Sequence, residues 1–246
     1  MTPTAFDYKR MKLIYDYAAD RYLRSLPPEH FMEATAQATQ RKITVESFDL
    51  IHVARPDVQC FSELLVQYPK PGENPDKPGQ VVPDNMVVVH REPIIADTNF
   101  ATLLQPVGPL LVLEYVSKNS VRKDYELSYA KYEKELRVPY YMIFYPDADE
   151  LSLFHLREEE YHAVPPNAAG RFAIPELELE AGLLGEWVRF WFRGELLPLP
   201  GDLLIERDAA REQRDDARKQ LSAERQARLA AEAELAKLRE ELAKAK

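Results

Sequence analysis

Cysteine is almost absent from this sequence of 246 residues. The single cysteine, Cys60, excludes an intramolecular disulfide and a cysteine-rich zinc module. Long apolar runs are missing as well, because no stretch approaches the roughly 18 continuous apolar residues of a membrane span. The N-terminus also lacks the charged-then-apolar layout of a signal peptide. We therefore expect a cytoplasmic protein with no membrane segment.

The sequence also lacks an excess of positive charge, because its formal net charge is −9 at pH 7. Proteins with general affinity for nucleic acids usually carry a positive surface that releases counterions from the phosphate backbone. Bulk charge therefore argues against nonspecific DNA binding. What is present is a hydrophobic content of 46%, with 10% aromatic residues. This composition suits one domain with a proper core, plus an appendage.

A buried carboxylate is predicted near the middle of the chain. The apolar, β-branched run Leu110–Leu113 with Val116 indicates a core strand, yet Glu114 lies inside it. A carboxylate in a core strand is unfavourable unless something compensates it. The segment Val82–Val89 repeats the arrangement, with Asp84 at the start of a second apolar strand. If the two strands are neighbours, both carboxylates converge on one divalent cation.

Several short motifs follow one another in a recognisable order. They are the Pro83-Asp84 pair, the strand around Glu114 that ends at Ser117, and a helix that holds Asp124 and Tyr132 before Val138-Pro139. Together they resemble the Uma-two family of restriction-endonuclease-like proteins, within the PD-(D/E)xK nuclease superfamily, over roughly residues 33–199. The resemblance implies an α/β restriction-endonuclease-like core, a mixed sheet flanked by helices, and Mg²⁺-dependent or Mn²⁺-dependent hydrolysis of DNA.

The resemblance also implies roles for individual residues. Asp84 and Glu114 would bind the metal ion, and the backbone carbonyl of Tyr115 would complete the inner set. Such folds often add an acidic residue from an early helix, and Glu33 lies at that place; the alternative is an exposed glutamate. The lysine expected two residues after the glutamate is replaced by Val116.

The lysine that the family usually carries on the following helix is missing too, because Ser128 stands between Asp124 and Tyr132. Two substitutes are open. Lys131 lies on the helical face of Asp124 and Ser128, and Lys118 shares a face with Glu114 if the strand continues. In a third interpretation, neither Lys131 nor Lys118 takes part in catalysis, and the site is catalytically impaired. Several basic residues lie near the proposed site in the sequence, and they form either a locally basic catalytic face or a solvated helix face. They are Lys118, Arg122, Lys123, Lys131, Lys134 and Arg137.

The pattern predicts three regions: an N-terminal helical segment over residues 1–30, an α/β domain over 31–200, and a C-terminal helix over 201–246. The resemblance implies that the α/β domain is restriction-endonuclease-like. On the predicted central helix, the stripe Tyr125, Tyr129, Tyr132 and Leu136 faces the sheet. The other expected elements are a helix over 41–53, strands over 58–68, 85–89, 140–145 and 151–156, a Pro/Gly-rich loop over 69–79, an irregular connection over 92–109, and a peripheral β extension over 172–192.

The C-terminal region is rich in Ala, Arg, Glu, Lys and Leu. Leu221, Leu235 and Leu242 share one heptad position, and Ala231 and Leu238 share another, which predicts a homodimeric coiled coil. A single polar helix is the alternative. For the whole chain, the leading prediction is a DNA endonuclease. The alternatives are a catalytically impaired scaffold or binding protein that oligomerises through this helix, and a hydrolase of smaller phosphate esters.

Overall fold

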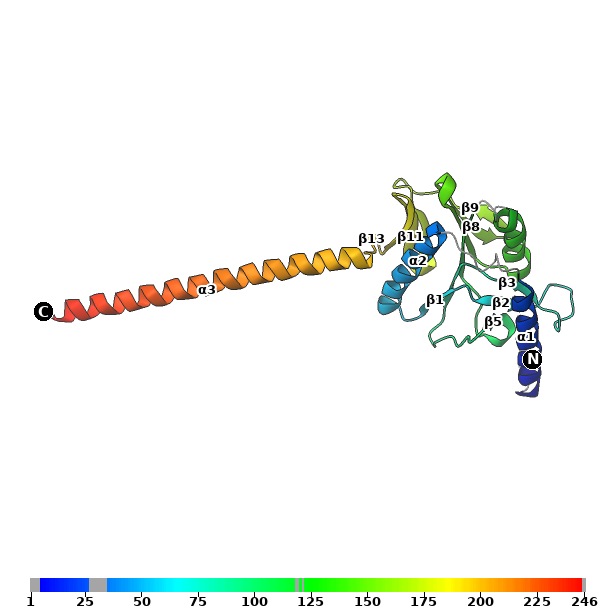
Figure 1. Cartoon of the computed structure of the whole chain (residues 1–246), viewed down its shortest axis with the longest axis horizontal. Helices are drawn as coiled ribbons and strands as arrows, with labels where there is room; N and C mark the ends of the chain where they lie inside the picture. Colours follow the sequence, from blue (N-terminus) through cyan, green and yellow to red (C-terminus); the bar gives the residue numbers. More distant parts are fainter. Residues whose placement is uncertain (1–4, 27–34, 118–119, 121, 245–246) are drawn as a thin grey trace. The chain divides into compact units, whose positions relative to one another are not determined.

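The computed structural model describes residues 5–26, 35–117, 120 and 122–244, and the chain divides into two compact units (Figure 1). Met1–Leu197 forms an α/β unit, and Pro198–Lys246 contains one helix, α3 (Pro200–Lys244). Within the described ranges, no helix is both long enough and apolar enough to span a membrane.

The centre of the first unit is a six-stranded mixed sheet with the order β1-β4-β6-β7-β8-β9. Only β6 and β7 run parallel, and all the other neighbours are antiparallel. Every residue of β6 is buried, as expected for a strand covered on both faces. This mixed sheet confirms the predicted α/β class. The strands are β1 (Val58–Ser62), β4 (Asn85–Val89), β6 (Leu111–Tyr115), β7 (Tyr140–Tyr145), β8 (Glu150–Arg157) and β9 (Glu160–Ala163).

One face of this sheet is covered by α2 (Thr35–Ala54), which contributes Phe48 and Ile51 to the core. The same core includes residues of a smaller antiparallel sheet that corresponds to the predicted β extension. The buried Gln40 side chain bonds both the N–H and the C=O of Val188, which ties α2 to this sheet. Its strands are β10 (Phe172–Ile174), β11 (Leu179–Leu184), β12 (Trp187–Phe192) and β13 (Glu195–Leu196).

The other face packs against the segment that connects β6 to β7. This segment winds as two π-helical stretches, η3 (Lys123–Ser128) and η4 (Lys131–Leu136). Tyr132 is fully buried here, and Tyr125, Tyr129 and Leu136 pack partly buried against the same core. The predicted apolar stripe is therefore confirmed. The helix ends at Arg137, which takes a left-handed conformation with φ of 56°.

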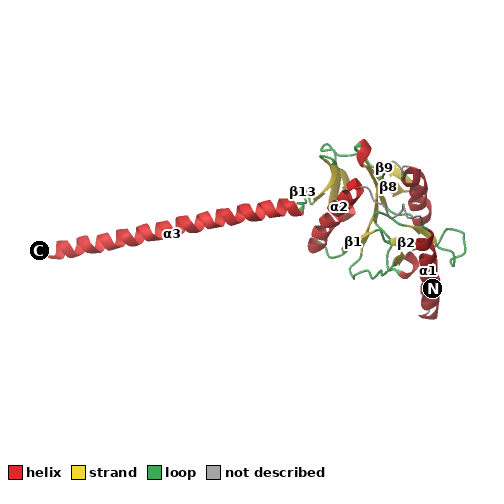
Figure 2. Ribbon diagram, viewed as in Figure 1, coloured by secondary structure: helices red, strands yellow, loops and turns green. Residues whose placement is uncertain are grey.

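A third, three-stranded sheet lies beside α1 (Ala5–Ser25). It has the order β3-β2-β5, with β3 (Gly79–Val81), β2 (Leu65–Tyr68) and β5 (Asn99–Ala101). The buried Tyr15 and Ala19 face this sheet, and Gln67 of β2 donates a hydrogen bond to the Tyr15 carbonyl. Figure 2 shows the long loops around these short strands. The described residues also include the 3₁₀ turns η2 (Thr102–Leu104), η5 (Pro146–Ala148) and η6 (Pro175–Leu177).

Three predicted elements need correction. The single strand expected over residues 58–68 is two strands in different sheets, because Glu63 adopts a left-handed φ of 49° and breaks the extended backbone. The connection over 92–109 contains β5, and the helix expected over 41–53 already begins at Thr35.

Candidate active site

Two acidic side chains meet where β4 begins beside β6. The register pairs Asn85 with Leu113, so Asp84 lies opposite Glu114. The Asp84 N–H donates a hydrogen bond of 3.4 Å to Oε2 of Glu114. Strand alternation places Glu114 on the face of Val112 and Val116, which is the face that η3 and η4 cover. The structure thus brings together the two acids that the sequence analysis singled out.

Tyr115 connects the acids to α2. Its backbone N–H donates to Oδ2 of Asp84 at 2.6 Å, and its carbonyl accepts a hydrogen bond of 2.5 Å from the Gln37 amide. Its buried hydroxyl donates to Oδ1 of Asn85 and is hydrogen-bonded to the Thr44 hydroxyl, both at 2.7 Å. A carbonyl oxygen has two lone pairs, so the Tyr115 carbonyl keeps one acceptor position beyond its bond to Gln37.

Each acid also has a cationic neighbour. Arg41 of α2 bridges Oδ1 of Asp84 and Oε1 of Glu63, each at 3.1 Å. On the opposite side, the Nζ atom of Lys123 lies 4.0 Å from Oε2 of Glu114 and 3.3 Å from Oδ1 of Asp124. The pair of acids therefore lies between a guanidinium group and an ammonium group, each supplied by a different helix.

Burial dominates the electrostatics of this cluster. Glu114 is completely buried, and burial raises its pKa well above the usual range; Lys123 opposes the shift, whereas Asp84 and Asp124 add to it. Burial also raises the pKa of Asp124, again with Lys123 opposing. The pKa of Lys123 is raised, chiefly by the negative charge of Glu114. Three carboxyl groups therefore act on one another through a poorly solvated region, and a further cation there is favourable.

One more group holds Glu114 in place. The hydroxyl of Tyr132, from η4, donates a hydrogen bond of 2.6 Å to Oε1 of Glu114. Tyr132 is itself fully buried. Both oxygens of the Glu114 carboxylate are thus oriented, one by Tyr132 and the other by the backbone of Asp84.

The donor set fits a hard divalent cation. Asp84, Glu114 and the Tyr115 carbonyl all offer oxygen, the ligand that Mg²⁺ prefers. Among the residues placed in the structure, no group of three or more His, Cys, Asp or Glu side chains forms a metal cage. Mg²⁺ does not require one, because it commonly retains several waters and uses one or two protein carboxylates. The site therefore suits a partly hydrated Mg²⁺ or Mn²⁺ ion.

Of the remaining candidates from the sequence, Lys131, Val116 and Ser128 lie in the described part of the chain. Lys131 donates its hydrogen bond of 3.0 Å to the backbone carbonyl of Gln80, and burial lowers its pKa. Val116 and Ser128, which replace the family lysines, are both buried. Lys118 and Glu33 lie outside the described residues.

Lys123 is a candidate site residue that sequence reasoning did not single out, although it belongs to the predicted group of basic residues. An α-helical reading places Asp124, Ser128 and Lys131 on one face. The segment is π-helical instead, with more residues in each turn, and its buried polar positions are Asp124, Ser128 and Glu133. The sequence feature that could have identified Lys123 as a site residue is its position at the start of this segment, next to Asp124.

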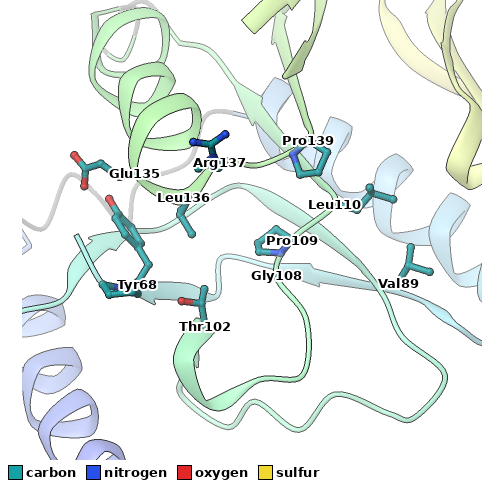
Figure 3. Close-up of a pocket in the computed structure, with 11 residues that line it drawn as sticks. Tyr68, Val89, Thr102, Gly108, Pro109, Leu110, Glu135, Leu136, Arg137 and Pro139 are labelled. Carbon is teal, nitrogen blue, oxygen red and sulfur yellow. The ribbon is translucent and has the colours of Figure 1, made fainter. Parts of the chain in front are cut away.

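A cavity of about 500 Å³ lies at the opposite end of β6, where Gly108 and Pro109 precede the strand. Figure 3 shows Tyr68 and Glu135 close together at one end of this cavity and Val89 at the other. Neither Asp84 nor Glu114 lines it. It is therefore separate from the paired acids.

Comparison with known proteins gives one family. The family model Uma2, described as "Putative restriction endonuclease", matches residues 31–185. A similar solved structure is described as a "putative nuclease belonging to DUF820" from Anabaena variabilis ATCC 29413. It shares 16% sequence identity over 59% of this chain and 75% of that chain, with a TM-score of 0.43. No curated protein matches the chain. The paired acids, Lys123 and Tyr132 lie within the matched region, whereas α1 and α3 lie outside it.

Proposed function

This chain belongs to the Uma2 family, as the resemblance predicted, and from this premise we propose that it is an endonuclease that hydrolyses DNA phosphodiester bonds with Mg²⁺ or Mn²⁺. The observation that carries the proposal is the pairing of Asp84 with Glu114 beside the Lys123 ammonium group. Two oriented carboxylates next to a cation form an arrangement suited to phosphoryl chemistry.

In this proposal Asp84, Glu114 and the Tyr115 carbonyl hold the metal ion. A bound divalent ion of this kind lowers the pKa of a water ligand and polarises a phosphoryl oxygen. The hydrogen bonds from Tyr132 to Glu114 and from the Tyr115 N–H to Asp84 keep both carboxylates in place before the metal ion arrives. Arg41 limits the repulsion between the acids by pairing with Asp84.

Lys123 takes the role that the family lysine has elsewhere. Its raised pKa keeps it protonated at neutral pH, so it acts as a fixed positive charge and not as a base. A fixed ammonium group beside the carboxylates stabilises the negative charge that develops on a phosphoryl group under attack. Lys131 instead donates a hydrogen bond to the backbone carbonyl of Gln80, and Lys118 is the alternative to Lys123.

DNA cleavage tests this assignment directly. Supercoiled plasmid is incubated with the wild-type chain and Mg²⁺, with EDTA in a parallel sample. Glu114→Ala removes one proposed ligand, and we expect it to reduce nicking by about 100-fold or more. The matched control is Glu126→Ala on η3, an exposed acid paired with Arg122 and not with the site. Cleavage that is unchanged in Glu114→Ala would reject this site.

A scaffold function is the second candidate, and the surface of α3 favours it. Leu221 and Leu235, on one heptad position, are 67% and 53% exposed along a helix of 45 residues. We propose that two copies of the chain pair through these positions as a coiled coil. A scaffold that has lost catalysis would not be stabilised by Mg²⁺ or Mn²⁺, whereas the endonuclease would.

A further inference from the structure

A groove of about 470 Å³ lies between α1 and the residues just before and within β3. Figure 1 shows the loop that leads into β3 beside α1. The helix contributes positions spaced as a single face, next to the face that packs on the small sheet. The groove is lined by Ile14, Tyr17, Ala18, Arg21, Tyr22 and Ser25 from the helix, and by Asp76, Lys77, Pro78 and Gln80 from the other wall.

The lining combines the groups that recognise a nucleotide. Tyr17 is 66% exposed and offers an aromatic face, with the guanidinium group of Arg21 5.9 Å from the centre of its ring. Lys77 adds a second positive charge on the opposite wall. The acid in the groove, Asp76, is paired with Arg10 at 3.0 Å. Aromatic faces with nearby cations are the usual platform for unpaired bases.

An amide in the groove has an unused donor. The Nε2 atom of Gln80 is buried and makes no hydrogen bond to the described part of the chain. A side-chain amide reads the edge of a base by hydrogen bonding, as aromatic side chains read its face. Gln80 lies in the wall of the groove, and its buried donor reaches a base edge when the side chain turns toward the bound base.

One residue of the groove, Tyr22, lies within electrostatic range of Lys123. Tyr22 lies close enough to Lys123 for the lysine charge to lower the tyrosine pKa, against a larger increase from burial. The Gln80 carbonyl accepts the hydrogen bond of Lys131. Lys131 in turn lies within electrostatic range of Lys70 and Lys123, with the Glu135 carboxylate nearby. Positive side chains therefore lie near both the groove and the paired acids, in a protein whose net charge is −9.

We propose that this groove binds an unpaired nucleotide next to the scissile phosphodiester, so that the substrate is single-stranded or frayed DNA. This inference rests on the proposed function, because it places the groove beside that reaction. A base inside a continuous duplex cannot enter a groove of this kind without leaving its stack, which costs free energy that an unpaired base does not lose. One wall of the groove, from α1, lies outside the region that the family model matches, and the other wall, from Asp76 to Gln80, lies within it.

Oligonucleotide binding tests the groove without any cleavage. All variants carry Glu114→Ala and are measured in EDTA. The probe is a single-stranded 12-mer with one 2-aminopurine, and the same sequence as a duplex is the comparison. We expect the single strand to bind more tightly, with quenched fluorescence. Tyr17→Ala should weaken its binding by about fivefold or more, the lower end of what the loss of one base–aromatic stack costs.

Two variants keep the test specific. Tyr8→Ala, which removes an exposed tyrosine of α1 outside the groove, should leave binding unchanged, and Tyr17→Trp should retain it. Equal affinity for the duplex, equal losses in Tyr17→Ala and Tyr8→Ala, or no binding of the single strand would each overturn the proposal. If the single strand binds through Tyr17 but the wild-type protein does not cleave DNA, the binding role of the groove is supported and only the proposed endonuclease function is rejected.

Discussion

The ammonium group of Lys123 lies 4.0 Å from Oε2 of Glu114, a carboxylate with no exposed surface. Lys123 begins η3, and Glu114 belongs to β6, so the contact joins the helical layer to the sheet. No other lysine of the described segments is paired with Glu114. This contact makes the role of the lysine testable by substitution.

Lys123→Ala should lower Mg²⁺-dependent DNA cleavage by about 100-fold or more, because it removes a fixed positive charge from the reacting phosphoryl group. The measurement is the initial rate of plasmid nicking at saturating metal. Lys131→Ala is the matched control, since it removes a half-buried lysine that bonds the Gln80 backbone. An equal loss of rate in both variants would show that Lys123 has no special role.

Tyr132→Phe should destabilise the metal-free protein by about 1–3 kcal/mol, since Glu114 then loses a hydrogen bond in a buried position. Urea unfolding at neutral pH measures this change in the free energy of unfolding. Tyr129→Phe alters the same helical segment and leaves the bond to Glu114 intact. If the two variants unfold at the same urea concentration, the Tyr132 bond contributes nothing measurable.

The Cys60 thiol should make stability fall at alkaline pH. Burial raises the pKa of Cys60 from 9.0 to about 12, while the Asn85 amide, which donates to its sulfur, opposes the shift. Between these values the folded chain keeps a proton that the unfolded chain has lost, so the free energy of unfolding decreases as pH rises.

Comparison with Cys60→Ala isolates this effect from the titrating tyrosines. Between pH 8 and pH 10, the wild type should lose roughly 1 kcal/mol more stability than the variant, measured by urea unfolding at each pH. Parallel losses in the two proteins would mean that the thiol ionises as readily in the folded chain as in the unfolded one.

The double variant Leu221→Lys with Leu235→Lys should convert a dimer into a monomer, because it places charges on the proposed seam of α3. Sedimentation equilibrium of the full chain gives the mass. Leu229→Lys, at a 57% exposed leucine off the seam, should remain dimeric. A wild-type chain that sediments as a monomer would contradict the coiled coil.

Much of the core was predictable from local pattern. Leu111–Tyr115 and Tyr140–Tyr145 are buried strands because both are continuous apolar runs, and Glu114 stands out as the one acid inside them. The spacing of Tyr125, Tyr129 and Tyr132 predicted the buried helical face correctly. The opposition of Asp84 and Glu114 followed from placing their strands side by side.

The remainder depended on features that sequence patterns do not carry. The left-handed φ of Glu63 splits one predicted strand, and its backbone N–H bonds the Asp84 carbonyl, a contact across 21 residues. The π-helical winding of η3 and η4 leaves Lys131 at the Gln80 carbonyl, while Lys123 reaches Glu114. A pattern that assumes α-helical turns cannot distinguish these two lysines.

Thermal unfolding with Mn²⁺ tests the central claim most directly. Wild type and Glu114→Ala are unfolded with and without Mn²⁺, and plasmid nicking is then measured on the same samples. The account predicts that Mn²⁺ raises the unfolding temperature of the wild type alone, because the ion binds the folded site and not the unfolded chain. It also predicts nicking by the wild type alone. Identical unfolding curves together with intact plasmid would contradict a metal-dependent nuclease at Asp84 and Glu114.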